Sequence, residues 1–113
     1  MLNWNTLTNA AQLIDIKNKS FEKPQVLFKH STRCSISKVA LQRIEKAADI
    51  PAADFHFLDL IRFRNVSDKI VEEFSVYHES PQILVIKNAK CIYDESHLGI
   101  NLDELHEQIF SAN

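Results

Sequence analysis

The sequence has little of several residue types, with two cysteines, one glycine and three prolines among 113 residues. Two cysteines do not make a disulfide framework, so the expected compartment is a reducing cytosol. Neither a Cys-x-x-Cys nor a His-x-x-x-His pair occurs, which argues against a zinc site. The cysteines are therefore either small buried residues or chemically active ones.

An excess of positive charge is also absent, since the formal net charge is -2 and the pI is about 6.2. A nucleic-acid partner is therefore not expected. The first residues show no basic segment followed by an apolar one, and no apolar run approaches membrane-spanning length. The 113 residues suffice for one core. We expect a single domain over 1–113, located in the cytoplasm and without a membrane partner.

The first half of the chain predicts a strand, a helix and a second strand. Val26–Phe28 is a continuous apolar run, typical of a strand covered on both faces. A helix is predicted from Cys34 to Ala48, ending before Pro51 in Asp49-Ile50-Pro51. Its apolar stripe contains Ile36, Val39, Ala40, Ile44, Ala47 and Ala48. Phe55–Leu60 reads as the next strand, so the two strands should be parallel.

The remaining elements follow from similar patterns. Thr8-Asn9 can cap a helix that ends near Ser20 and turns Ala10, Ala11 and Ile14, with Leu13 a further candidate, toward one face. A helix near Ser67 precedes Pro81 and a hairpin of Ile83–Ile86 and Cys91–Tyr93. A last helix follows Gly99 and should point Leu102, Leu105, Ile109 and Phe110 inward. Trp4 is expected to pin the start of the chain to the core.

Cys34 is the strongest candidate for a functional residue. It follows a strand, a short polar turn and the start of a helical pattern, where unpaired backbone N–H groups favour a thiolate. Arg33 would act in the same direction. The flanking residues Ser31, Thr32, Ser35 and Ser37 are polar, which suits access by solvent. The alternative is a partly buried cysteine that packs at a helix end.

A cysteine at the first turn of a leading strand-helix-strand unit, with a proline opening the later hairpin, resembles the thioredoxin superfamily. The string Thr32-Arg33-Cys34-Ser35-Ile36-Ser37, with Glu79-Ser80-Pro81-Gln82 downstream, is similar to monothiol bacilliredoxin-like proteins of the bacillithiol system. The resemblance implies an α/β, thioredoxin-like three-layer sandwich with a mixed sheet of about four strands. It departs from thioredoxins at Ser37, which replaces the second cysteine, and at Phe28, which replaces a buried acid. The Gly-Gly pair of glutaredoxins and the Cys-Gly-Phe-Ser string of iron–sulfur monothiol glutaredoxins are absent.

The resemblance also implies a set of supporting residues. Pro81 is expected to be cis after Ser80, leaving the Ser80 backbone N–H and C=O free to pair with an extended thiol or peptide. Three interpretations are open for Ser37. It is a remnant of the second, resolving cysteine, it forms a hydrogen bond with the Cys34 sulfur, or it satisfies backbone donors in the first turn of the helix. His30 and His78 come from segments that should converge on the thiol, or they are solvated loop residues. Cys91 is expected to be a small buried residue rather than a redox partner.

The resulting hypothesis is a monothiol thiol-disulfide oxidoreductase. Cys34 would remove a low-molecular-weight thiol from S-thiolated cytosolic proteins, and the resemblance implies bacillithiol as the co-substrate. No bound cofactor or metal is required. Two alternatives remain: a protein-binding or redox-sensor module modified at Cys34 without turnover, and a monothiol carrier of a metal or iron–sulfur unit.

Overall fold

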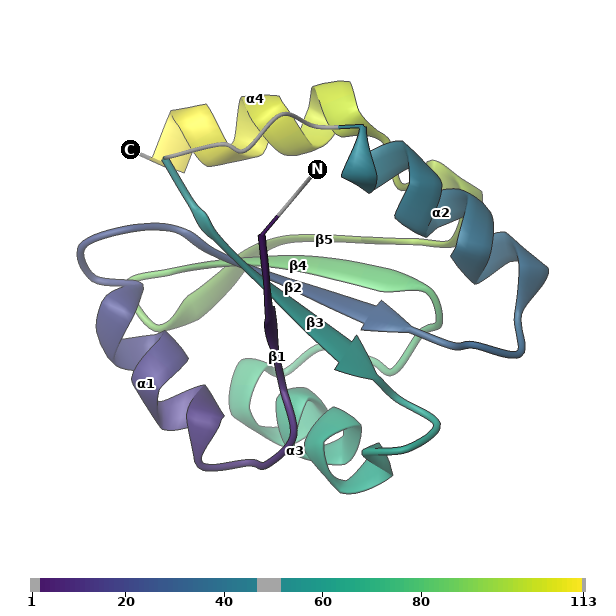
Figure 1. Cartoon of the computed structure of the whole chain (residues 1–113). Helices are drawn as coiled ribbons and strands as arrows, with labels where there is room; N and C mark the ends of the chain where they lie inside the picture. The colour runs from purple at the N-terminus through teal and green to yellow at the C-terminus, as the bar shows by residue number, and fades with distance from the viewer. Residues whose placement is uncertain (1–2, 47–51, 113) are drawn as a thin grey trace.

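The computed structural model describes residues 3–46 and 52–112 and places a five-stranded sheet between two layers of helices (Figure 1). The strands are β1 (Trp4–Thr6), β2 (Gln25–His30), β3 (Asp54–Asp59), β4 (Gln82–Lys87) and β5 (Lys90–Ser96). The helices are α1 (Gln12–Lys19), α2 (Ser35–Glu45), α3 (Arg64–Phe74), the short 3-10 helix η1 (His97–Gly99) and α4 (Leu102–Ala112).

The sheet is mixed, with the strand order β1-β3-β2-β4-β5. β2 and β3 are parallel and are connected through α2, whereas β4 is antiparallel to both β2 and β5. The predicted parallel unit, hairpin and three-layer α/β architecture are thereby confirmed. The predicted stop at Asp49–Pro51 and the stripe residues Ala47 and Ala48 lie outside the described residues.

The expectation of about four strands missed β1. This strand has three residues, and its register pairs Trp4 with Phe55 and Thr6 with Phe57. A strand of three residues is too short to show a periodic sequence pattern, so it is recognised only by its pairing with β3. Trp4 holds this edge strand in place, because its ring packs against Phe55 and Phe57 and its Nε1 donates to Glu45 Oε1 at 2.9 Å. Trp4 therefore anchors the start of the chain, as predicted.

The sheet separates two hydrophobic clusters, with α2 and α4 on one face and α1 and α3 on the other (Figure 1). All six residues of β2 are buried, which confirms a central strand covered on both faces. Side chains alternate along a strand, so Val26 and Phe28 lie in the α2/α4 cluster and Leu27 lies in the α1/α3 cluster.

The predicted inward faces of α1 and α4 were wrong in part. In α1 the buried residues are Leu13 and Ile16, and Ile14 is 64% exposed. In α4, Leu105 and Ile109 are buried as expected, but Phe110 is 60% exposed. Each helix contacts the sheet through a narrow stripe, and an apolar residue one position from that stripe is rotated by about 100° toward solvent.

The stripe of α2 also differs from the prediction. Its buried residues are Ser37, Ala40 and Ile44, whereas Ile36 and Val39 are 38% and 40% exposed. The polar Ser37 takes the inward position because its hydroxyl finds hydrogen-bond partners there. Two apolar side chains are thereby left at the surface beside the start of the helix.

Asn88 and Ala89 form the turn of the hairpin in the second half of the chain. Both have positive φ values, 54° and 63°, and they join β4 to β5 in a two-residue hairpin. At Gly99, a Cβ would lie 2.7 Å from the Glu95 carboxyl group, so the flexible Glu95 side chain would have to move aside. Within the described part of the chain, no helix is long and apolar enough to cross a membrane.

Candidate functional site

Cys34 lies where β2 has ended and α2 begins. Its backbone N–H donates to Ser31 O at 3.2 Å, which closes a tight turn after the strand. Its own carbonyl accepts from the Lys38 N–H at 3.2 Å, so Cys34 is the N-cap of α2. The thiol is free and its residue is partly exposed. The neighbouring residues Thr32, Arg33 and Ser35 are exposed.

This position gives the sulfur a defined electrostatic setting. The first N–H groups of a helix have no partner within it, and the N-terminal end carries a partial positive charge. Arg33 adds a full positive charge next to Cys34, and no described acidic side chain forms an ion pair with it. A negatively charged ligand is therefore favoured at this end of the helix.

Ser37 occupies the position of a second cysteine but points into the protein. It is fully buried, and its Oγ accepts from the Ser31 N–H at 3.0 Å and lies 2.7 Å from His30 Nδ1. Among the described residues, no hydrogen bond joins Ser37 to the Cys34 sulfur. Of the alternatives open for Ser37, the contacts match a serine that satisfies a backbone donor, here the donor of the Ser31 turn.

His30 is part of the core beneath this turn rather than a solvated loop residue. It is 5% exposed, and its ring stacks on Phe28 with centroids 5.9 Å apart and contacts Phe57 at 5.4 Å. Burial lowers the pKa of His30 below its ordinary value. A neutral imidazole is therefore favoured, and the structure gives no contact of His30 with the thiol.

Ser80 and Pro81 lie beside the Cys34 turn. The antiparallel register pairs Lys29 with Gln82, so the chain just before β4 runs alongside the chain that leaves β2. The Ser80–Pro81 peptide bond is cis, the isomer expected from the sequence. Within the described residues, the Ser80 backbone N–H and C=O make no hydrogen bond, and the buried Ser80 Oγ has no partner.

His78 does not bond the thiol but contacts a residue that the sequence reasoning missed. Its Nδ1 lies 2.9 Å from the Nζ of Lys29, a fully buried lysine in β2. Burial and the charge of Lys29 lower the pKa of His78. Lys29 could have been found from the sequence, because it directly follows the apolar run of a strand expected to be covered on both faces.

The position of Cys34 and Ser37 agrees with the protein family that nearly the whole chain matches. A family model for the monothiol bacilliredoxin BrxC matches residues 5–105. The chain belongs to this bacilliredoxin family. Membership indicates a thiol redox function, and the match spans β2, α2, the Cys34 turn and the Ser80–Pro81 segment.

Several solved structures are similar to this chain in fold. A protein described as a candidate oxidoreductase with a thioredoxin fold is 26% identical, with a TM-score of 0.75 over 90% of this chain and 89% of that chain. A thioredoxin from Fasciola hepatica is 23% identical, with a TM-score of 0.74 over 96% and 99% of the two chains. A thioredoxin from Malassezia sympodialis is 17% identical, with a TM-score of 0.75 over 97% and 90%. The two thioredoxins establish the thioredoxin fold.

The second cysteine of the chain, Cys91, lies in a different environment. Cys91 is in β5, packs against the α1/α3 cluster, and its Sγ contacts Tyr93 O at 3.3 Å. Burial raises the pKa of the Cys91 thiol to about 11. The thiolate is therefore scarce at neutral pH. Cys91 packs against the core as expected of a small apolar residue, but it is partly rather than fully buried.

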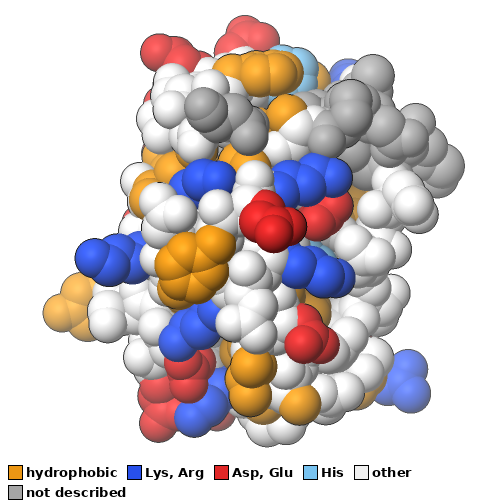
Figure 2. All heavy atoms as spheres, turned by 90° about the vertical axis from the view of Figure 1, so that its left-hand side faces the viewer, with side chains coloured by type: hydrophobic (Ala, Val, Ile, Leu, Met, Phe, Trp, Pro, Cys, Tyr) orange, Lys and Arg blue, Asp and Glu red, His pale blue; other side chains and the backbone are white. Residues whose placement is uncertain are grey.

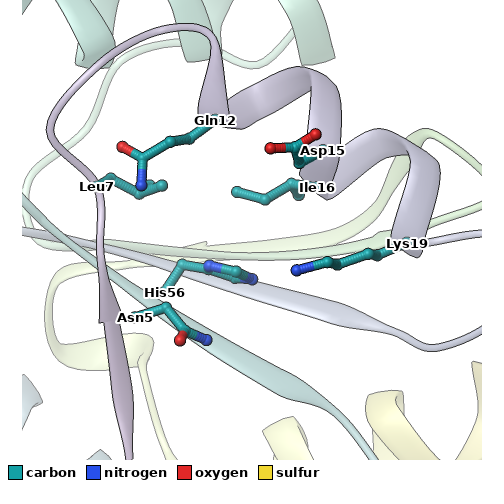
Figure 3. A pocket seen from close by; sticks show the side chains of 7 residues that line it. All are labelled: Asn5, Leu7, Gln12, Asp15, Ile16, Lys19 and His56. Atoms are coloured by element: carbon teal, nitrogen blue, oxygen red, sulfur yellow. The ribbon is translucent and has the colours of Figure 1, made fainter.

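Other parts of the described surface show no comparable combination of a reactive side chain and a binding site. A cavity of about 170 Å³ lies between α1, β1 and β3, and the side chains lining it include Gln12, Lys19 and His56 (Figure 3). The face near α1 carries mixed positive, negative and apolar side chains without one continuous patch (Figure 2). Within residues 3–46 and 52–112, no group of three or more His, Cys, Asp or Glu could hold a metal ion.

Proposed function

We propose that this protein is a monothiol thiol-disulfide oxidoreductase that uses Cys34 to remove bacillithiol from protein mixed disulfides in the cytoplasm. The observation that carries the proposal is the Cys34 thiol at the N-cap of α2, with Ser37 in place of a second thiol. Because Ser37 cannot resolve a mixed disulfide, a second small-molecule thiol has to do so.

The reaction consists of two thiol-disulfide exchanges. In the first, the Cys34 thiolate attacks the bacillithiol sulfur of the mixed disulfide, the old S–S bond breaks, and the client protein leaves as a thiolate that takes up a proton. In the second, the thiolate of another bacillithiol attacks the disulfide on Cys34. Oxidised bacillithiol is released and the Cys34 thiolate is restored, so the two electrons come from bacillithiol.

Ser80 supports substrate docking in this reaction. Its unpaired backbone N–H and C=O lie on the segment beside the Cys34 turn, where an extended peptide could form main-chain hydrogen bonds. The exposed Ile36, next to the start of α2, adds apolar contact area. The exposed Arg33 supplies positive charge for an anionic ligand.

The test is turnover of a bacillithiolated test protein with excess bacillithiol. The wild type and Cys91→Ala should both release many equivalents of free protein per enzyme, and Cys34→Ala should release none. Stoichiometric capture on Cys34 without recycling would refute the proposal in favour of a redox sensor. A coloured protein isolated without oxygen would instead favour a carrier of an iron–sulfur unit.

A further inference from the structure

The central strand β2 carries a buried charged residue, Lys29, at a position where an apolar side chain is usual. Lys29 is fully buried in the central strand β2, and its side chain lies on the α1/α3 face together with Leu27 and Leu84. Lysines usually extend along the surface and keep the amine in water. An amine without water needs protein partners, and those of Lys29 all belong to one segment.

That segment is Tyr77–Gln82, which leads into β4 and contains Ser80. The Lys29 Nζ lies 2.9 Å from His78 Nδ1 and donates to Gln82 Oε1 at 3.1 Å. The Gln82 side-chain nitrogen in turn donates to Tyr77 O at 3.0 Å. Two contacts therefore join the amine to His78 and Gln82, and a third bond, within the segment, ties Gln82 to Tyr77.

Packing alone does not hold this segment. A groove of about 280 Å³ borders it on the side of β5, and Tyr77, Glu79 and Gln82 are among its lining residues. A second cavity of about 310 Å³ adjoins Tyr77, whose side chain is 90% exposed.

Several contacts hold the segment. Besides the bonds to Lys29, the His97 N–H donates to Pro81 O at 3.0 Å, Ser67 Oγ lies 3.4 Å from His78 Nδ1, and Glu79 pairs with His97 at 3.3 Å. The bonds to Lys29 are the ones that reach the segment from the buried central strand.

The charges around the amine favour one protonation pattern. Burial is the main cause that lowers the pKa of Lys29 to about 8, with Arg64 acting in the same direction and Asp68 and Glu79 opposing it. Lys29 is therefore mostly protonated at neutral pH, and Nδ1 of a neutral His78 ring accepts a hydrogen bond from it. Within the described residues, no carboxylate forms an ion pair with Lys29.

We propose that Lys29 is a positioning residue of the redox site: its buried ammonium holds the Tyr77–Gln82 segment, and with it Ser80, against the turn that presents Cys34. The catalytic part of this inference rests on the proposed function. Replacing the ammonium by an apolar side chain of similar shape removes its desolvation cost but leaves Gln82 Oε1 and His78 Nδ1 without this donor, so a moderate loss of stability is expected. The specific effect of the replacement should be on docking of the disulfide.

The main experiment compares Lys29→Met with the wild type and with Lys90→Met, which removes an exposed lysine from β5. Lys29→Met should remain folded, with a lower melting temperature than the wild type because Gln82 Oε1 and His78 Nδ1 lose a donor. Alkylation of its Cys34 by iodoacetamide, which needs no docking, should stay within about twofold of the wild type. With a bacillithiolated test protein, kcat/KM should fall about 10- to 100-fold, because small misplacements of a docked substrate have effects of that size. Lys90→Met should match the wild type in all three measurements.

A second experiment does not depend on turnover. Backbone amides of Tyr77–Gln82 should exchange with deuterium faster in Lys29→Met than in the wild type. If the wild type itself shows no turnover, the proposed function fails, and this measurement alone decides the inference. Unchanged exchange, or an unchanged kcat/KM in an active background, would overturn the role of Lys29.

The acid side of the pH profile gives a third readout, which remains available if Lys29→Met does not fold. Protonated His78 would face the ammonium of Lys29, with Arg64 adding repulsion and Asp68 and Glu79 opposing it. The wild-type kcat/KM should therefore fall more steeply as the pH drops below 6.5 than that of His78→Asn, whose Oδ1 accepts the same bond without titrating. The same decrease of kcat/KM below pH 6.5 in the wild type and in His78→Asn would contradict the inference.

Discussion

The imidazole of His56 should make the fold sensitive to acid. His56 is 5% exposed, and its Nε2 lies 2.7 Å from Gln25 Oε1. The Gln25 amide nitrogen donates to Asp54 Oδ2 and to Lys23 O, so the Gln25 oxygen is left to accept the Nε2–H of a neutral ring. Burial lowers the pKa of His56 to about 4, with Lys19 adding to the shift and Asp54 opposing it (Figure 3).

The coupling of proton binding to folding gives the sign and size of this loss of stability in acid. The pKa of His56 is depressed in the folded state, to about 4 from the ordinary 6.5. The unfolded chain therefore binds the proton first as the pH falls. The stabilisation is present above pH 6.5 and is lost as the pH drops from 6.5 toward 4. Between pH 7 and pH 4.5, the free energy of unfolding should fall by about 2.5 kcal/mol on account of this one group.

Urea unfolding followed by circular dichroism at the two pH values measures the loss. For an m-value of about 1–3 kcal/mol per molar urea, the midpoint of the wild type should fall by about 0.8–2.5 M. His56→Gln keeps a side-chain donor for Gln25 but cannot titrate, so its loss should be smaller by about 2.5 kcal/mol. His97→Asn is the matched control, because it removes a half-exposed histidine at a positive φ that asparagine tolerates.

The comparison between variants isolates His56 from the other groups that titrate in acid. His30 and His78 also have lowered pKa values and contribute to the acid sensitivity of every protein in the set. If His56→Gln loses as much stability as the wild type between pH 7 and pH 4.5, the reasoning from burial is refuted.

The remaining predictions concern packing and thiol reactivity. Leu13→Ala should lower the free energy of unfolding by about 2–5 kcal/mol and Ile14→Ala by less than about 0.5 kcal/mol, as measured by urea unfolding; equal effects would contradict the assigned face of α1. Ser37→Ala should lower it by about 1–3 kcal/mol, because a buried backbone donor loses its acceptor, and a thermally neutral variant would contradict this. Peptide mapping after brief iodoacetamide treatment at pH 7.5 should find the label on Cys34, since about one Cys91 thiol in 3,000 is ionised there; preferential labelling of Cys91 would overturn the site.

Much of the candidate site could be predicted because its signals are local. A continuous apolar run, a polar turn and a helical pattern are enough to place Cys34 at the junction of a strand and a helix. The assignment of Ser37 to the position of a missing second thiol comes from the resemblance to thioredoxins, whose second cysteine stands three residues after the first. Pro81 directly before an apolar run marks the entry to the hairpin.

Other features depend on contacts between distant parts of the chain. β1 exists because its three residues pair with Phe55–Phe57, and no local pattern encodes that pairing. The exposure of Ile14 depends on the rotation at which its helix meets the sheet, which an amphipathic pattern defines only approximately. A polar Ser37 turned inward could not be recognised before its partners His30 and Ser31 were placed.

The sequence by itself determined the order of the elements, the parallel unit and the single thiol at its first turn, because each depends on residues close together in the chain. Only the tertiary structure decided that Lys29 is buried and that its amine meets His78 and Gln82, some 50 residues downstream. The physical reason is that burial and hydrogen bonding of a charged group depend on which segments the sheet brings together, and strand pairing sets that arrangement over long separations.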